Sequence, residues 1–143
     1  MINRLSKVFS CYANCKKSLL TMPHRETFEI ELCKTGYDVY RINTGVQWNQ
    51  KSPRPDNHYI LPEGVIPNYI AYDIFLIPHH QYDDHIIKQI SSNIQVPTIQ
   101  VDDIGAVSDG SQYPFGWAKN ISESSEEFVA YWKMILKQHA RFL

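Results

Sequence analysis

Side chains able to transfer a proton occur at three places in the chain, each directly after a run of apolar residues. In chain order they are His24, His79, His80, Asp102 and Asp103. An imidazole titrates near neutral pH and a carboxylate can accept a proton, so these groups suit acid–base chemistry on a hydroxyl group. Their position after apolar runs places them at the ends of expected buried strands.

Two of these places have a structural explanation beside the chemical one. His24 precedes an expected helix, where it could hold an anion, move a proton, or simply cap the helix or lie at the surface. Asp102 and Asp103 could form a carboxylate pair for base catalysis or metal binding. Equally, one of them could end a strand and order the loop that contains Gly105.

The histidine-rich segment that follows Pro78 does not predict a metal site. His79 and His80 are adjacent on an extended segment, so their rings point apart, and no His-x-x-x-His pair exists to place two rings on one helix face. A polar loop that caps a helix through Asp83 or Asp84 is the simpler interpretation. Cys33 falls on an apolar helix face and is expected to be a buried structural thiol. We predict no bound metal.

Two further residues are candidates for contacting a ligand. Thr21 lies at the end of the first expected strand. Trp48 lies in residues 45–67, an irregular, proline-rich segment typical of a functional loop or a packed arm. Its indole could stack on a sugar ring or a partner surface, or could fold back onto the core.

The sequence lacks the common loops for a nucleophilic serine or for phosphate. No Gly-x-Ser-x-Gly segment occurs, and residues 21–26, which follow the first expected strand, contain no glycine. A dinucleotide-binding site of the usual kind needs glycines there so that its backbone can approach the pyrophosphate. We therefore predict no cofactor.

Apolar periodicity and turn residues predict strands that alternate with helices. The expected strands are residues 18–22, 37–43, 59–61, 72–77 and 96–101; the expected helices are 24–34, 83 or 84 to about 93, and 122 onward. Gly36 stands where the first helix should end. The first dozen residues could form a strand or a helix. The pattern predicts an α/β fold, a single Rossmann-like domain over residues 1–143 with a mainly parallel sheet.

Composition narrows the classes of partner and compartment. The chain has 143 residues, 43% of them hydrophobic and 20% charged, with a net charge of −1, which gives no reason to expect a nucleic-acid partner. No apolar run approaches the roughly 20 residues of a membrane span. The three cysteines and a start unlike a signal peptide favour the cytoplasm.

Several ordered segments resemble the N-terminal half of GT-B-type glycosyltransferases, those of phages and bacteria in particular. They are SLLTMPH at residues 18–24, ELCKTGYDVY at 31–40, WN at 48–49, RPDN at 54–57, YDIFLI at 72–77 and VPTI at 96–99. The similarity spans roughly residues 17–104, and its motifs are short and mostly structural.

The resemblance implies an acceptor-side domain whose nucleotide-sugar-binding half is not among these 143 residues, so that the chain alone would be inactive. A catalytic base of that family would correspond to His24, His79 or Asp102. The residues expected to contact substrate are Thr21, His80, Asp103 and Trp48. The expected partner is a second glycosyltransferase domain or subunit, or another copy of the chain. An exposed apolar face around Tyr59, Ile60, Tyr69 and Tyr72 would fit a missing partner, whether the chain is a transferase domain or a binding module.

Two other readings of the same sequence stay open. A non-catalytic binding or structural module, such as a phage-encoded assembly protein, agrees with the absence of a recognisable catalytic motif. A receiver-like or flavodoxin-like signalling domain shares the alternation of strands and helices. That third interpretation comes last, because the sequence does not show the acidic pocket or flavin loop that it needs.

Overall fold

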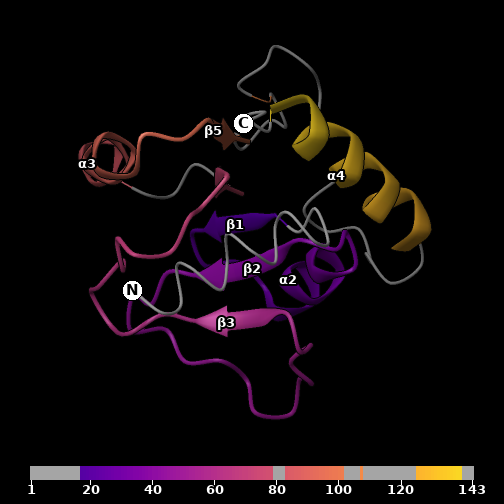
Figure 1. Cartoon of the computed structure of the whole chain (residues 1–143). Coiled ribbons are helices and arrows are strands. Elements are labelled where there is room, and N and C mark those ends of the chain that lie inside the picture. Colours follow the sequence, from indigo (N-terminus) through magenta and orange to yellow (C-terminus); the bar gives the residue numbers. More distant parts are fainter. Residues whose placement is uncertain (1–16, 79–82, 102–106, 108–124, 140–143) are drawn as a thin grey trace.

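The computed structural model of the protein describes residues 17–78, 83–101, 107 and 125–139. Within these residues, a five-stranded parallel sheet is flanked by three helices (Figure 1). In chain order the elements are β1 Ser18–Thr21, α2 Glu26–Cys33, β2 Asp38–Arg41, β3 His58–Ile60, β4 Ile74–Ile77, α3 Asp84–Ile94, β5 Thr98–Gln100 and α4 Ser125–His139. The predicted α/β, Rossmann-like fold with a parallel sheet is confirmed.

The strand order is β3-β2-β1-β4-β5, so the first described strand, β1, lies in the middle of the sheet. It moves outward from β1 through β2 to β3, then returns to pair β4 on the other side of β1. The point of reversal lies between β1 and β4. In open parallel sheets such a reversal leaves a crevice beyond the carboxyl ends of the strands, where ligands bind.

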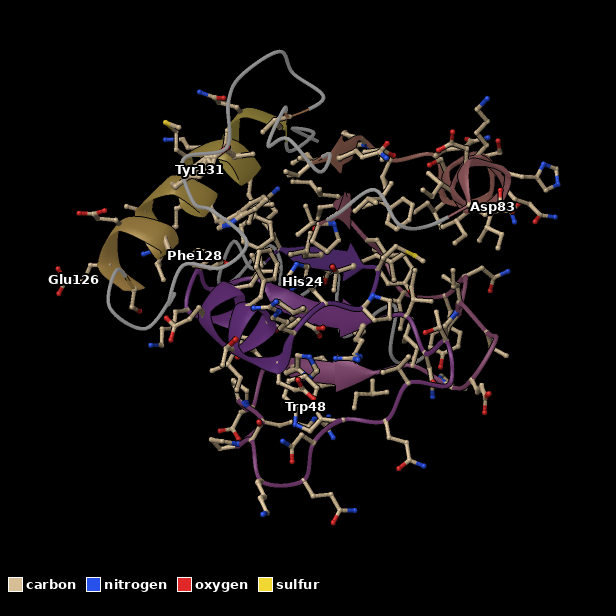
Figure 2. The ribbon with its side chains drawn as sticks, turned by 180° about the vertical axis from the view of Figure 1, so that it is seen from behind. His24, Trp48, Asp83, Glu126, Phe128 and Tyr131 are labelled. Carbon is tan, nitrogen blue, oxygen red and sulfur yellow. The ribbon has the colours of Figure 1, made fainter. Side chains whose placement is uncertain are left out.

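One face of the sheet is covered by α2 and α4. Leu19 and Val39 point to this face, and they belong to one buried cluster with Phe28 from α2 and with Phe128 and Trp132 from α4. The ring of Phe28 meets those of Phe128 and Trp132 edge to face, at centroid distances of 5.3 and 5.8 Å. Figure 2 shows Phe128 on the side of α4 that faces α2.

The opposite face is covered by α3 and by part of the connection from β3 to β4. Leu20 and Phe75 point to this side and cluster with Ile87 of α3 and with Leu61 and Tyr72. The alternation of side chains along each strand therefore supplies both layers of the core.

The helix ends follow the residues that the sequence offers for them. Asp83 caps α3, as one of two predicted capping residues, by accepting a hydrogen bond of 2.8 Å from the His85 amide. Gly36 follows α2 and has a φ of +90°, a conformation that favours glycine. Of the two adjacent isoleucines near the start of α3, one is buried and one is not. Ile87 faces the sheet, whereas Ile86 is 48% exposed.

The connection between β2 and β3 contains no helix. Residues 42–57 are irregular throughout, as predicted for the start of the proline-rich segment. A loop therefore takes the place that a crossover helix commonly holds between parallel strands. In the part of the chain that the structure describes, no helix is both long enough and apolar enough to cross a bilayer.

Candidate functional site

The carboxyl ends of three strands lie side by side at one edge of the sheet. Thr21 at the end of β1 pairs in register with Arg41 at the end of β2, and Arg41 pairs with Ile60 at the end of β3. A fold of this class binds ligands beyond this edge, most often at the reversal beside β1. The candidate site is built from the segments that follow these ends.

A pocket of about 740 Å³ lies beyond the ends of β2 and β3. Its lining consists of Asn43, Gly45, Val46, Gln47, Trp48, Gln50, Ser52, Pro53, Arg54, Ile60 and Glu63. The volume falls within the range typical of small-molecule sites. Most of the lining belongs to the loop of residues 42–57, so the irregular β2–β3 connection forms the pocket.

The chemistry of the lining is polar and close to neutral. Asn43, Gln47 and Gln50 carry amides, each able to donate and accept hydrogen bonds, while Arg54 and Glu63 carry opposite charges. Such a lining suits an uncharged ligand rich in hydroxyl groups better than a strongly anionic one. Arg54 is partly committed, because its Nη2 donates to the backbone oxygen of His58 at 3.0 Å.

Trp48 is held in place at one side of this pocket. Its indole Nε1 donates to the backbone oxygen of Ser52 at 3.0 Å. Its ring lies 4.6 Å from the ring of His58, and the Arg41 guanidinium carbon is 5.3 Å from its centroid, within cation–π range. Trp48 thus packs back onto the domain and still lines the pocket. Figure 2 shows it beside β3.

Beneath Trp48 lies a buried charge cluster made of Glu29, Arg41 and His58. The side chains of Glu29 and His58 are 0% exposed and that of Arg41 is 2% exposed. One carboxylate oxygen of Glu29 accepts from Arg41 Nη1 at 2.8 Å, and the other lies 2.8 Å from His58 Nε2. Burying charges is costly unless they are paired and hydrogen-bonded, and here both oxygens of the carboxylate are engaged.

The contacts of His58 fit a neutral ring with its hydrogen on Nε2. In that tautomer Nε2 donates to Glu29, and Nδ1 is an acceptor. Nδ1 is buried and has no hydrogen-bond partner among the described residues. A hydrogen on Nδ1 would therefore be a buried donor with no acceptor among these residues, whereas the neutral form leaves only an unpaired acceptor.

His24 is tied to the same carboxylate through its backbone. Its amide donates to Glu29 Oε2 at 2.9 Å. Its ring lies tilted against the ring of Phe28, with centroids 4.4 Å apart, and its Nδ1 accepts from the Arg25 backbone amide at 2.7 Å. The imidazole thus lies at the rim, at the start of α2 (Figure 2), and one of its nitrogens is engaged in local backbone structure.

The other predicted site residues divide into two groups. Thr21 is buried, and its hydroxyl donates to the backbone oxygen of Met22 at 2.9 Å, so this group is used within the strand end. The remaining four predicted residues, His79, His80, Asp102 and Asp103, lie outside the described residues. Of the predicted residues, His24 contacts Glu29 through its backbone amide, and Trp48 packs on Arg41 and His58, the two side chains that this carboxylate holds. Only Trp48 lines the pocket described above.

Sequence reasoning did not single out the buried charge cluster. The signal was nevertheless present. Glu29 lies three and four residues before Leu32 and Cys33, on the face of α2 that packs against the sheet, and Arg41 shares the side of β2 that carries Val39. A charged residue at an apolar position predicts a buried partner of opposite charge.

Cys33 is a buried free thiol, as predicted. Burial raises its pKa to about 12, with smaller contributions from the negative charges of Glu29 and Asp38. The thiolate, which is the nucleophilic form, is therefore disfavoured. The residue serves packing on the α2 face.

Of the tyrosines whose exposure would fit a missing partner, two are exposed on the side of the sheet opposite α2. Tyr59 and Tyr69 are 40% and 43% exposed, but Tyr72 is buried, because it packs in the core beneath this face. Tyr40 stacks on Tyr59 at 4.8 Å. Burial, assisted by Asp38, Tyr59 and Tyr69, raises the pKa of Tyr40 to about 12.

Fold and site together define a small parallel α/β domain of Rossmann-like topology with a polar pocket at the carboxyl edge of its sheet. Comparison of the chain with protein-family models, curated proteins and solved structures finds no match. Within the described ranges, no group of three or more His, Cys, Asp or Glu side chains could hold a metal ion.

Proposed function

We propose that this chain is a glycosyltransferase-like domain that binds an acceptor sugar in the pocket beside Trp48. On this proposal the nucleotide-sugar donor binds to a second domain or subunit, and the domain alone does not catalyse transfer. The observation that carries the proposal is the polar pocket at the carboxyl edge of a Rossmann-like sheet, lined by amides and an indole.

The lining supports a sugar over other ligands of similar size. A sugar hydroxyl can both donate and accept a hydrogen bond. The side-chain amides of Asn43, Gln47 and Gln50 can also do both, so they can pair with such hydroxyls. Trp48 adds apolar area beside them. Because Arg54 and Glu63 offset each other, the pocket holds no excess positive charge with which to select a phosphate.

Transfer would need a base at the acceptor hydroxyl. The hydroxyl would lose its proton to that base, its oxygen would bond to the anomeric carbon of the nucleotide-sugar, and the nucleoside diphosphate would leave. Our candidates for the base are His24, His79 and Asp102. Only His24 lies among the described residues, and its Nδ1 accepts from the Arg25 amide, so Nε2 would carry the hydrogen in the neutral ring.

The hydrogen bond from the Arg25 amide to His24 Nδ1 favours a second candidate function. An imidazole nitrogen committed to the backbone, like the Thr21 hydroxyl committed to Met22, serves structure rather than proton transfer. Both observations agree with a non-catalytic binding module that uses the same pocket. The two candidates share ligand binding and differ only in chemistry.

Calorimetric titration of the purified chain tests the proposal. The panel contains neutral mono- and disaccharides, nucleoside diphosphates and nucleotide-sugars. We expect at least one neutral sugar to bind with a dissociation constant below about 1 mM, and the nucleotides not to bind. Gln50→Ala should weaken sugar binding, whereas Gln89→Ala, an exposed glutamine on α3, should leave it unchanged.

The outcomes separate the two functions. Nucleotide binding by the chain alone, or the absence of any sugar binding, overturns the proposed acceptor domain. If a sugar binds, the chain is next mixed with any protein that co-purifies with it, and release of nucleoside diphosphate from a nucleotide-sugar is measured. Release that falls in His24→Ala favours the transferase; no release favours the binding module.

A further inference from the structure

The loop that forms the pocket contains no helix or strand, so other contacts must hold it in one shape. The backbone amide of Asn49 donates to Glu26 Oε1 at 3.0 Å, and the indole of Trp48 donates to the backbone oxygen of Ser52. Each is a single hydrogen bond at the surface or partly buried. The larger contact is the face of Trp48, which rests on Arg41 and His58.

Arg41 and His58 form a fixed platform because Glu29 holds both of them. The two residues come from neighbouring strands and share the side of the sheet that α2 covers, since Val39 pairs with His58 and Arg41 lies two residues beyond Val39. Both contacts to the carboxylate measure 2.8 Å. Without that carboxylate, a buried guanidinium and an imidazole would face each other with no acceptor between them.

The same carboxylate also fixes the rim at the end of β1. Glu29 Oε2, which accepts from Arg41, accepts from the His24 amide at 2.9 Å. One side chain on α2 therefore helps to position two of the three predicted site residues that the structure describes: Trp48 through the platform, and His24 through its backbone.

We propose that Glu29, with Arg41 and His58, forms a positioning cluster that holds Trp48 as a wall of the ligand pocket and ties that wall to His24. These residues act through Trp48 and His24 and do not themselves contact the ligand. The inference deepens the proposed sugar site and rests on it only for the effect on ligand affinity. The effect on Trp48 stands independently of any ligand.

The first readout is the indole N–H signal of Trp48 in a two-dimensional nitrogen–proton spectrum of the labelled chain. The chain has three tryptophans, so Trp48→Phe assigns the signal, and Trp132, buried in the core, serves as an internal reference. We expect Arg41→Lys, which keeps the charge but loses the planar guanidinium, to shift or broaden the Trp48 signal and leave that of Trp132 in place. Arg25→Lys, at an exposed arginine, should change neither.

The second readout is affinity for the best-binding sugar of the panel. Arg41→Lys and Trp48→Phe should each weaken it by about tenfold, as expected for loss of a desolvated cation–π contact and of the wall it supports. Because Glu29→Gln risks unfolding the chain, Glu29→Asp is measured beside it. The shorter carboxylate should give a smaller change in the Trp48 signal than the amide does.

The results distinguish failure of this inference from failure of the proposed function. A Trp48 signal that stays in place in folded Arg41→Lys and Glu29→Gln overturns the positioning role. So does unchanged sugar affinity in a variant whose Trp48 signal has moved. A displaced Trp48 signal in a protein whose wild type binds no sugar supports the cluster's hold on Trp48 and overturns the sugar site.

Discussion

Replacing Glu29 by glutamine should destabilise the protein more than almost any other single change of a polar residue. The substitution keeps the size of the side chain and an oxygen that can accept from the His24 amide. It removes the negative charge that lies between Arg41 and His58, and it turns one acceptor into an amide donor. Arg41, 2% exposed, is then a buried cation whose anionic partner has been removed.

The expected cost follows from that burial. Removing one partner of a buried ion pair costs about 3–5 kcal/mol, because the remaining charge stays desolvated. A domain has roughly 5–15 kcal/mol of stability in total, so the loss is a large share of it. At this chain length, the melting temperature should fall by about 10–20 °C.

Urea unfolding followed by circular dichroism measures the change. Glu126→Gln, at an exposed carboxylate in the first turn of α4, is the matched control and should cost less than about 1 kcal/mol (Figure 2). Adding Arg41→Met to the Glu29→Gln chain should recover part of the loss, since no buried cation is left unpaired. A Glu29→Gln chain as stable as the Glu126→Gln control would refute the view that these charges depend on each other.

Three further outcomes are expected from other contacts. In a chain whose other two cysteines are replaced by serine, Cys33 of the folded protein should react with iodoacetamide at pH 8 about 1,000-fold more slowly than Cys33 of the urea-unfolded protein. The reason is that folding raises its pKa from 9.0 to about 12, and equal rates would contradict its burial. Folding raises the pKa of Tyr40 from 10.0 to about 12, so the neutral phenol stabilises the folded state, and this contribution is lost as pH rises from about 10 through 12. Tyr40→Phe should therefore lessen the fall of the urea midpoint over this pH range, and the same fall in the variant would contradict the raised pKa. Asn57→Ala should lower the free energy of unfolding in urea by about 1–3 kcal/mol, because the side-chain amide of Asn57 donates to the backbone oxygens of Cys33 and Tyr37 at 2.8 and 2.9 Å. Asn93→Ala, at an exposed asparagine, should cost less, and equal effects would mean that these two hydrogen bonds do not stabilise the fold.

The layers of this fold could be predicted from apolar patterning because apolar burial is repeated at every turn of a helix and every second residue of a strand. Ile74–Ile77 is apolar on both sides and lies inside the sheet, next to β1. Phe128, Trp132 and Leu136 recur at helical spacing and are buried together. Errors at element ends were small, as for α2, which starts at Glu26 rather than near His24.

The site was harder to predict because it depends on pairs of residues from different elements. In the sequence alone, Glu29 has the features of an ordinary surface charge. Only the fold shows that Arg41 from β2 neutralises its carboxylate and that His58 from β3 forms a hydrogen bond with it. Trp48 was a candidate from its place in a loop, but nothing in its neighbours shows that it would rest on Arg41. A single sequence does not reveal which distant side chains share one buried carboxylate.

The carboxylate that bridges three segments also has a consequence for the order of folding. Glu29 lies 12 residues from Arg41 and 29 from His58, so these bonds close loops of modest length. If these charges pair before water is excluded, neither has to be desolvated without its partner, which would be costly. Short loops also cost little entropy to close. We therefore expect α2, β2 and β3 to assemble early as one unit around this salt bridge, with β4, α3 and β5 added later across β1. The pocket loop, whose tryptophan lies over the bridge, would then take its final shape only after the strands beneath it have paired.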